Sequence, residues 1–518
     1  MADRRGRQPV KRDHFEVLCE KLKSGKLLGV HLVAAACMQF ATKATSRGHV
    51  FDSAPVRGLD VRGELATIIG GKRGAAITSE ETSAIAEVLK KSENKPLAAW
   101  CVAHLISLAV DEDFTAGFTS APPVYGLKHL QAFPVVANGC VNLYGKDSGL
   151  STRSGTERKQ YDPSSVGGLS LWHRDRATRP FNVIIDKAGG DEFNCCFENN
   201  TLKIALIQLN ESLDDLCITT LSDETDPEPT FFGVYPKDKR KQIEAATDRL
   251  EQAVVAGAGI ALLPELTMTE DAEKEIGESL AGQIIPDGTD RPILRGVVSG
   301  SFHHRDEGQQ RNSTVIRFPR TDPALEPRRH SKSGAFYFSS PRLFLEKTTC
   351  DTGRANAAEA ALKKLGPEAL RLPPERFRED VKPSHEIRVF LGAKFSVVVV
   401  ICADLLTPTF RDVLKMLSPS LVLVCNMTET LQPFLDAAHE LILGCQATLA
   451  SVNNPAEHLE GPVKGALIGM PLRDEQRRIQ TADFDKARKG EILLFDVRGC
   501  RLEHWYGGQR VAINPVPS

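Results

Sequence analysis

The sequence predicts a layered α/β domain over residues 201–510, preceded by a mostly helical domain over residues 13–112. Two observations indicate the α/β domain. From residue 200 onward, short apolar runs alternate with amphipathic segments, and the run at 395–401 (FSVVVVI) is apolar enough to be covered on both faces of a sheet. A third observation indicates the helical domain, because apolar residues before position 113 recur at a period near 3.6.

The helical domain begins with apolar residues at positions 15, 18 and 22, which share one helical face. Ser79–Lys91 starts with an acidic first turn, as expected at a capped helix N-terminus. Pro96 opens a further apolar segment, since proline is tolerated in the first helical turn. We expect residues 1–12 to form a basic tail, residues 113–200 an irregular linker or packing region, and residues 511–518 a second tail.

The segments of the α/β domain follow in order. Short apolar runs are predicted to be strands, and longer amphipathic segments are predicted to be helices. The predicted strands are 202–209, 259–263, 296–302, 313–318, 395–401, 421–425, 447–452, 466–468 and 491–497, and the predicted helices include 407–417 and 430–445.

Composition and charge exclude several classes of protein. The chain has 41% apolar and 25% charged residues, which argues against global disorder. Its formal net charge of -2 makes nucleic acid an unexpected partner. The longest nearly uncharged stretch, Leu97–Val110, falls short of the roughly 20 residues that span a bilayer, so no membrane partner is expected. The basic start lacks a following apolar segment, and the 12 cysteines include no C-x-x-C pair, which favours a cytoplasmic protein with reduced thiols.

Cys402 stands at the predicted junction of a strand and a helix, where a catalytic group would be held rigidly, and Glu265 and Lys332 are two further candidates. Cys402 follows the most apolar run of the chain and precedes a predicted helix, and Glu265 follows another apolar run directly after Pro264. A carboxylate at such a position needs a partner or a task, because burying a charge is costly. Lys332 ends the sequence His330-Ser331-Lys332. Each residue alone fits an ordinary structural role.

Taken in order, these motifs resemble the nitrilase superfamily, whose members use a Glu-Lys-Cys triad. The resemblance covers about residues 201–510. Glu265 and Lys332 are 67 residues apart, similar to the family, whereas the 70 residues from Lys332 to Cys402 are more than usual, so residues 350–386 are predicted to be an insertion. The matching segments are Lys203–Asn210, Leu263–Leu266, Val297–His303, Arg311–Pro319, His330–Lys332, Val400–Pro408 and Leu421–Asn426.

The resemblance implies a four-layer α-β-β-α sandwich and a hydrolase of small amides, nitriles or carbamoyl compounds. In this interpretation Cys402 is the nucleophile, Glu265 the general base, and Lys332 with the backbone N–H of Ala403 the oxyanion-binding group. A neighbouring lysine is expected to lower the pKa of the thiol. The resemblance also implies a homo-oligomer, and the mechanism needs no metal or organic cofactor.

The family often has a second glutamate after the lysine. Glu346 is the first candidate for this role, with Glu375 and Glu379 as alternatives. The helix predicted at 430–445 departs from the family pattern, since it offers His439 and Glu440 where arginine and aromatic residues are common.

Two other functions stay open at this point. The chain could be a catalytically idle scaffold whose N-terminal domain binds a partner protein, which would fit the unfamiliar residues 13–112. It could instead release ammonia from glutamine for another active site.

Overall fold

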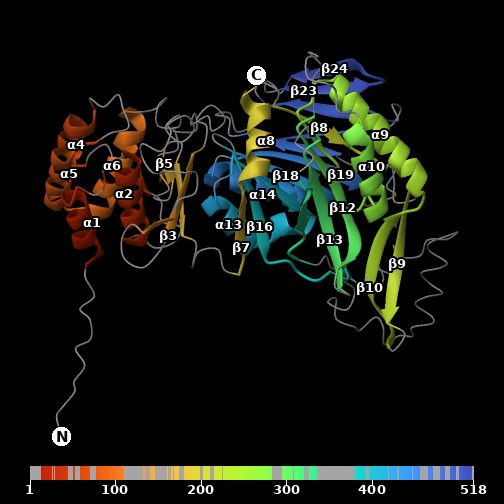
Figure 1. The fold of residues 1–518 in the computed structure, drawn as a ribbon, viewed down its shortest axis with the longest axis horizontal. Helices are drawn as coiled ribbons and strands as arrows, with labels where there is room; N and C mark the ends of the chain where they lie inside the picture. Colours follow the sequence, from red (N-terminus) through yellow and green to blue (C-terminus); the bar gives the residue numbers. More distant parts are fainter. Residues whose placement is uncertain are drawn as a thin grey trace, which may run out of the picture. The chain divides into compact units, whose positions relative to one another are not determined.

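The computed structural model describes most of residues 13–515, and its longest gaps are 110–131, 146–159, 283–293, 335–377, 456–464 and 471–478. The chain divides into two compact units. The first contains Met1–Arg179, and the second contains Pro180–Lys415 and Pro419–Ser518. Each unit is described by itself below (Figure 1).

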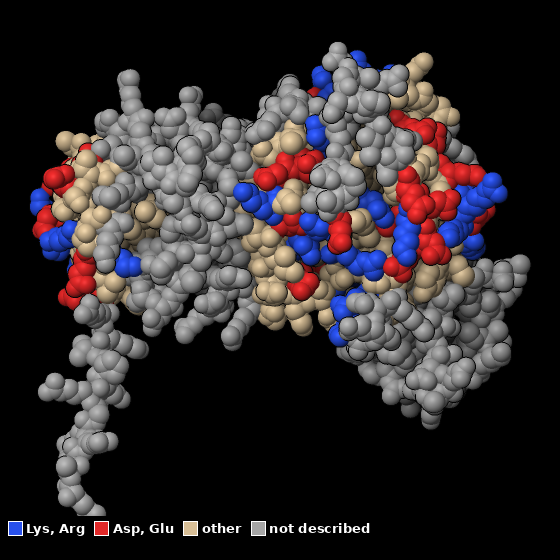
Figure 2. Space-filling view, viewed as in Figure 1, with Lys and Arg blue, Asp and Glu red and all other residues tan. Residues whose placement is uncertain are grey.

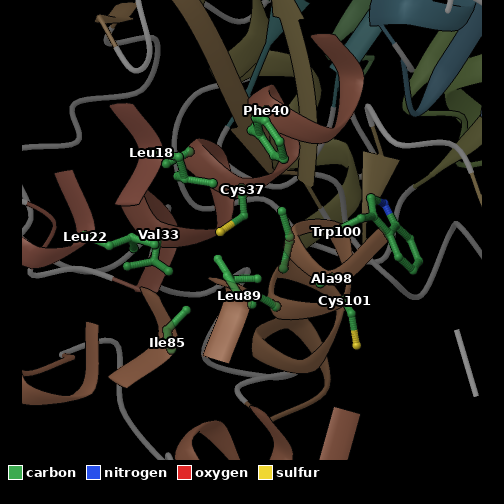
Figure 3. Close-up of a cluster of buried hydrophobic side chains, with 14 of the residues drawn as sticks. Leu18, Leu22, Val33, Cys37, Phe40, Ile85, Leu89, Ala98, Trp100 and Cys101 are labelled. Atoms are coloured by element: carbon green, nitrogen blue, oxygen red, sulfur yellow. The ribbon is translucent and has the colours of Figure 1, made fainter. Parts of the chain in front are cut away.

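The helices of the first unit share one apolar core. Leu18, Val33, Ile85 and Trp100 come from four different helices and are fully buried together (Figure 3). Helix α5 begins one residue earlier than a cap at Ser79 would place it, because Thr78 is the N-cap: its side chain accepts from the N–H of Glu81, whose side chain accepts from the N–H of Thr78. The helices are α1 (His14–Lys23), α2 (Val30–Ala44), α4 (Arg62–Ile69), α5 (Ser79–Lys91) and α6 (Lys95–Ala109).

The described part of residues 113–200 contains strands that the sequence analysis does not predict. Within the described part, four short strands form a sheet in the order β2-β3-β6-β5, and β1 pairs with β4. Apolar residues alternate along β3 and β6, but these strands are short and lie among Gly and Ser residues, so the sequence analysis does not predict them. These strands are β1 (Phe51–Asp52), β2 (Ala132–Pro134), β3 (Cys140–Gly145), β4 (Gln160–Tyr161), β5 (Ser165–Val166) and β6 (Leu169–His173).

The second unit contains two large sheets, so the predicted α/β class is confirmed. The eight-stranded sheet has the order β14-β13-β12-β11-β8-β22-β23-β24, and the seven-stranded sheet has the order β21-β20-β19-β18-β17-β16-β7. The first contains β8 (Lys203–Ile207), β11 (Ile260–Leu262), β12 (Gly296–Asp306), β13 (Gln309–Arg317), β14 (Arg328–Ser331), β22 (Ile492–Asp496), β23 (Arg501–Tyr506) and β24 (Gln509–Pro515). The second contains β7 (Asn182–Asp186), β16 (Glu386–Leu391), β17 (Ser396–Ile401), β18 (Leu421–Thr428), β19 (Thr448–Pro455), β20 (Ala466–Gly469) and β21 (Ile479–Ala482).

The outer boundaries of this unit differ from the predicted 201–510. Strand β7 pairs in parallel with β16, and α8 (Lys187–Glu198) packs on β16, so residues 182–198 belong to the second unit. Gly190 explains the close packing, since a Cβ there would lie 2.1 Å from the backbone carbon of Leu391. At the other end, β24 pairs with β23 through Pro515, so most of the predicted tail is a strand.

The centres of both sheets are parallel and buried. Strands β8, β11 and β12 run parallel, as do β17, β18 and β19. Every residue of β17 is buried, as expected for an apolar run covered on both faces. The two sheets contact each other through β8 with β19 and β11 with β18.

Helices cover each sheet. Helices α9 (Lys239–Val255) and α10 (Glu270–Gly282) pack on β22 and β12, and α14 (Gln432–Cys445) packs on β19, β20 and β21 (Figure 1). Leu250 of α9 and Ile492 of β22 are among the buried residues of this core. Burying one such side chain contributes about 1.5–3 kcal/mol.

A smaller third sheet lies next to the eight-stranded sheet. Strands β9 (Leu216–Asp223) and β10 (Asp226–Pro236) form an antiparallel hairpin, and β10 contacts β12. The short strand β15 (Arg378–Glu379) pairs in parallel with β10, with Phe232 opposite Glu379. The end of the predicted insertion 350–386 is therefore attached to the hairpin.

The surface of the second unit mixes both signs of charge. On the face that Figure 2 shows, its basic and acidic side chains are interspersed over the described residues. None of the helices in the described part of the chain combines the length and apolar character needed to cross a membrane.

Candidate active site

The three predicted triad residues follow the ends of three strands. Glu265 lies three residues after β11, Lys332 directly after β14, and Cys402 directly after β17. Strands β12 and β13 are antiparallel, as are β13 and β14, so β14 runs in the same direction as β11 and β12. Glu265 and Lys332 therefore lie at one edge of the eight-stranded sheet, and Cys402 reaches them from the seven-stranded sheet.

Lys332 lies between two buried carboxyl groups. Its Nζ is 2.8 Å from Oε1 of Glu265 and 2.7 Å from Oε2 of Glu379. The side chains of Lys332, Glu265 and Glu379 are only 1–2% exposed. Asn312 bridges the same two acids, because its Nδ2 lies 2.9 Å from Oε1 of Glu265 and 2.7 Å from Oε1 of Glu379.

The second glutamate of the described site is Glu379, which the sequence analysis gives as an alternative. The first candidate, Glu346, and the other alternative, Glu375, lie outside the described residues. Glu379 stands in a charged stretch with no apolar run before it, so the sequence holds no strong signal for it. Its position depends on the pairing of β15 with β10.

Two further polar residues of the cluster lie in the segments that resemble the family, and the sequence analysis predicts no role for them. Asn312 precedes Ser313 in β13, and it is fully buried. His303 in β12 has its Nε2 2.8 Å from Oε1 of Glu379. Adjacent histidines in a strand face opposite sides of the sheet, so the pair at 303 and 304 could have indicated that one of them faces the other sheet.

Cys402 occupies a sharp turn between strand and helix. Its φ of 43° lies in the left-handed region that non-glycine residues rarely adopt, and it opens the 3-10 helix η4 (Cys402–Leu406). Its thiol contacts the Glu265 carboxyl group, and Sγ lies 3.7 Å from the backbone oxygen of Met427. Leu266, next to Glu265, also has a positive φ of 56°. Unusual backbone conformations of this kind cluster at functional sites.

The thiol of Cys402 is held in its protonated form. Burial raises its pKa well above the usual range, the Glu265 carboxylate raises it further, and Lys332 lowers it by less. Lys332 does lower the pKa of the thiol, as expected, but burial and the Glu265 carboxylate outweigh it. A thiolate needs a group that accepts the proton at the same time.

The two glutamates have pKa values shifted in opposite directions. Burial raises the pKa of Glu265, and Glu379 raises it further, against a lowering by Lys332. Glu379 is equally buried, but Lys332 and His303 outweigh the burial and lower its pKa. The pKa of Lys332 is raised, because the two carboxylates outweigh its burial. The cluster thus contains a charged lysine, an ionised Glu379 and a titratable Glu265.

Asp404 lies in η4, directly after β17, and it hydrogen-bonds to the backbone that follows Lys332. It is fully buried, and its carboxylate accepts from the N–H groups of Ser333 and Gly334 at 2.7 and 2.9 Å. Burial raises its pKa to about 7, against the lowering by these two donors. Asp404, two residues after Cys402, therefore fixes the backbone next to Lys332.

The two residues that depart from the family pattern do not join this cluster. Glu440 is paired with Arg411 at 2.7 Å and Lys415 at 2.6 Å, and His439 is exposed. Ala403, the predicted oxyanion donor, is the second residue of η4 and is partly buried. Among the described residues, no group of three His, Cys, Asp or Glu side chains could hold a metal ion.

Comparison with known proteins gives matches only among solved structures, since no family model and no curated protein matches. An amidase from Nesterenkonia sp. is 13% identical, over 53% of this chain and 84% of that chain, with a TM-score of 0.31. A cysteine-to-alanine variant of the Nesterenkonia AN1 amidase from the nitrilase superfamily is 12% identical, over 55% and 87%, with a TM-score of 0.33. Nit3 of Saccharomyces cerevisiae, a member of branch 10 of the nitrilase superfamily, is 14% identical, over 54% and 86%, with a TM-score of 0.31. These matches are nitrilase-superfamily proteins.

Proposed function

We propose that the second unit is a carbon–nitrogen hydrolase of the nitrilase type. One observation carries the proposal: a thiol, two carboxyl groups and an ammonium group from distant parts of the chain meet in one buried cluster. Burying these four groups together is costly for a structural role, because apolar side chains of similar volume would serve stability as well or better. Perturbed pKa values in one cluster favour a catalytic role.

The first chemical step is proton transfer from Cys402 to Glu265. Glu265 is suited to this, since its pKa is raised and its carboxyl group contacts the thiol. When the proton moves, the charge of the cluster stays the same, because one anion replaces another. Sγ then attacks the carbonyl or nitrile carbon and forms a covalent bond, while the π electrons move to the substrate oxygen or nitrogen.

The remaining steps release the products. Lys332 and the backbone N–H of Ala403 are proposed to stabilise the negative charge that develops on the substrate. For an amide, the tetrahedral adduct expels the amine, which takes the proton held by Glu265, and a thioester on Cys402 remains. Glu265 then removes a proton from water, the hydroxide attacks the thioester, and the acid leaves as the Cys402 thiol is restored. No step requires a metal or organic cofactor.

Other parts of the expectation are proposals on the same basis. The two contacting sheets with their covering helices support a four-layer α-β-β-α sandwich. The separate apolar core of the first unit supports an N-terminal helical domain. Homo-oligomerisation and a cytoplasmic location are proposed from the family resemblance and the sequence.

The test is to trap the acyl group on Cys402. Wild type and the Glu265→Gln variant are incubated with small amides, including butyramide, and with nitriles. The variant is expected to retain any covalent adduct that forms, because it cannot activate water to hydrolyse the thioester. Peptide mass spectrometry is expected to place the adduct on Cys402, and Cys402→Ala should carry none. The proposal fails if no compound labels or is turned over by either protein while iodoacetamide still alkylates Cys402.

A partner-binding scaffold is the second candidate. The observation that favours it is the first unit, whose helices form a core of their own and contribute no described residue to the cluster around Cys402. Light scattering and turnover assays separate the candidates. A scaffold predicts self-association or a stable complex without turnover of any compound, whereas a solitary, active chain excludes it.

A further inference from the structure

The ring of His303 is held by two hydrogen bonds that define its tautomer. Its Nδ1 lies 3.0 Å from the backbone nitrogen of Val234, and this N–H can only donate. Nδ1 is therefore the unprotonated nitrogen, and Nε2 carries the hydrogen. Nε2 then donates to Oε1 of Glu379 at 2.8 Å. His303 is fully buried in its side chain, so water does not compete for either nitrogen.

We propose that His303 is a positioning residue: locked in one tautomer by the backbone of β10, it keeps Glu379 as the ionised partner of Lys332, so that Glu265 is the carboxylate that exchanges the proton. The inference deepens the proposed hydrolase function and rests on it for its catalytic meaning. His303 acts through Glu379 and contacts neither the thiol nor, in the proposal, the substrate.

The hydrogen bonds of the two carboxylates support this division of roles. Glu379 accepts hydrogen bonds from His303 and Asn312 on Oε1 and from Lys332 on Oε2. A carboxylate that accepts two or three hydrogen bonds is held in its ionised form. Glu265 shares Lys332 and Asn312 with Glu379, and its third contact is the Cys402 thiol, whose proton it accepts in the proposed reaction. Glu379 thus has a fixed imidazole donor where Glu265 has a thiol that gives up its proton, and this difference makes the two acids unequal, in the direction of their pKa shifts.

Strand β10 fixes both ends of this arrangement. Val234 supplies the N–H that selects the tautomer, and Phe232, two residues earlier, lies opposite Glu379 in the ladder between β10 and β15. Val234 is itself only 2% exposed. The hairpin β9–β10 is thus attached to the cluster through the backbone at both the histidine and the acid, which explains how a residue of the predicted insertion is held in place.

Loss of the His303 N–H has a defined electrostatic result. Among the described residues, the charged or titratable groups near Glu379 include Lys332, His303 and Glu265, and Cys402 contacts Glu265. Without the His303 N–H, the pKa of Glu379 rises, and Glu379 competes with Glu265 for the first proton that the cluster binds. When two carboxylates can take this proton, the apparent pKa for binding it is higher than when only one can. The pH at which Cys402 becomes reactive should therefore rise.

The experiment measures the alkylation rate of Cys402 by iodoacetamide against pH in the full chain, with peptide mass spectrometry to assign the site. His303→Leu is expected to move the acid limb of this profile upward by about one pH unit, roughly the loss of one charged hydrogen bond. His303→Gln keeps an amide N–H that can reach Glu379 and is expected to restore most of the shift. His304→Leu is the matched control, because it removes a buried histidine from the same strand without touching Glu379, and its profile should match wild type.

Three results would overturn the inference. These are an unchanged acid limb in His303→Leu, equal shifts in the Leu and Gln variants, or an equal shift in His304→Leu. If His303→Leu does not fold, nitrogen NMR of histidine-labelled wild type decides, since protonation of Nδ1 or a charged ring at neutral pH excludes the proposed tautomer. Neither measurement needs turnover, so a chain without hydrolase activity can still pass. Where a substrate is found, kcat should fall in His303→Leu while KM changes little.

Discussion

Replacing Lys332 by Met removes the cation from between two buried carboxyl groups and leaves a side chain of similar length in its place. The wild-type ammonium makes two charged hydrogen bonds, at 2.8 Å to Glu265 and 2.7 Å to Glu379. Each such bond contributes about 1.5–3 kcal/mol. Breaking a buried ion pair by removing one partner costs about 3–5 kcal/mol, so the free energy of unfolding should fall by that amount at pH 8.

The pH dependence identifies the cause. Without the cation, both carboxyl groups have pKa values in the folded state that lie above their values in the unfolded chain. At a pH between the unfolded and folded pKa values, the folded state therefore binds more protons than the unfolded state. Stability then decreases as pH rises through that window, and the loss is complete above the folded pKa values. Destabilisation by Lys332→Met should therefore be largest at pH 8 and smaller at pH 5, where protonation neutralises the acids.

Urea unfolding followed by circular dichroism at both pH values tests this, with the two units fitted as separate transitions because the chain contains two compact units. Lys415→Met is the matched control: its ammonium also pairs with two carboxylates, Asp412 and Glu440, but is 27% exposed. It should cost no more than about 1 kcal/mol. A loss below about 1 kcal/mol for Lys332→Met at pH 8, or an equal loss at pH 5, would refute the reasoning.

Three further changes probe the same site. Glu265→Gln should abolish turnover and slow the alkylation of Cys402 at pH 7, because the buried thiol loses the carboxyl group that accepts its proton; alkylation as fast as in wild type would contradict this. Asp404→Asn should lower the free energy of unfolding by about 1–3 kcal/mol, because the NH2 group of the new asparagine would face a backbone N–H. The raised pKa of the Asp404 carboxyl group, about 7, makes stability fall as pH rises between about pH 4 and 7; the variant should lose this decline, and an unchanged slope in a stability titration would count against the prediction. Gly300→Ala should cost about 1–3 kcal/mol and lower kcat, because φ is +75° and the new Cβ would lie 2.5 Å from the Pro264 oxygen, next to the proposed base; normal activity and melting temperature would show that the loop yields.

Local chemistry in the sequence determined the strands of the second unit. Apolar runs such as 395–401 and 421–425 can only be buried in the centre of a sheet, and β17 and β18 begin within one residue of these runs. A polar residue directly after such a run is held at the end of a strand. For this reason Glu265 and Cys402 were identifiable as candidates before their side chains could be placed together.

Only the tertiary structure decided which other groups surround the thiol and which carboxyl group carries the proton. Glu379 reaches Lys332 because β15 pairs with β10, and the two residues of β15 are too few to form a sequence pattern that specifies this partner. Alternation along a strand separates His303 from its neighbour, but it does not say which one faces the acid. The pKa of a buried carboxyl group depends on how many donors surround it, and these donors come from segments far apart in the chain. Their convergence is a property of the folded molecule, which no local segment of the sequence encodes by itself.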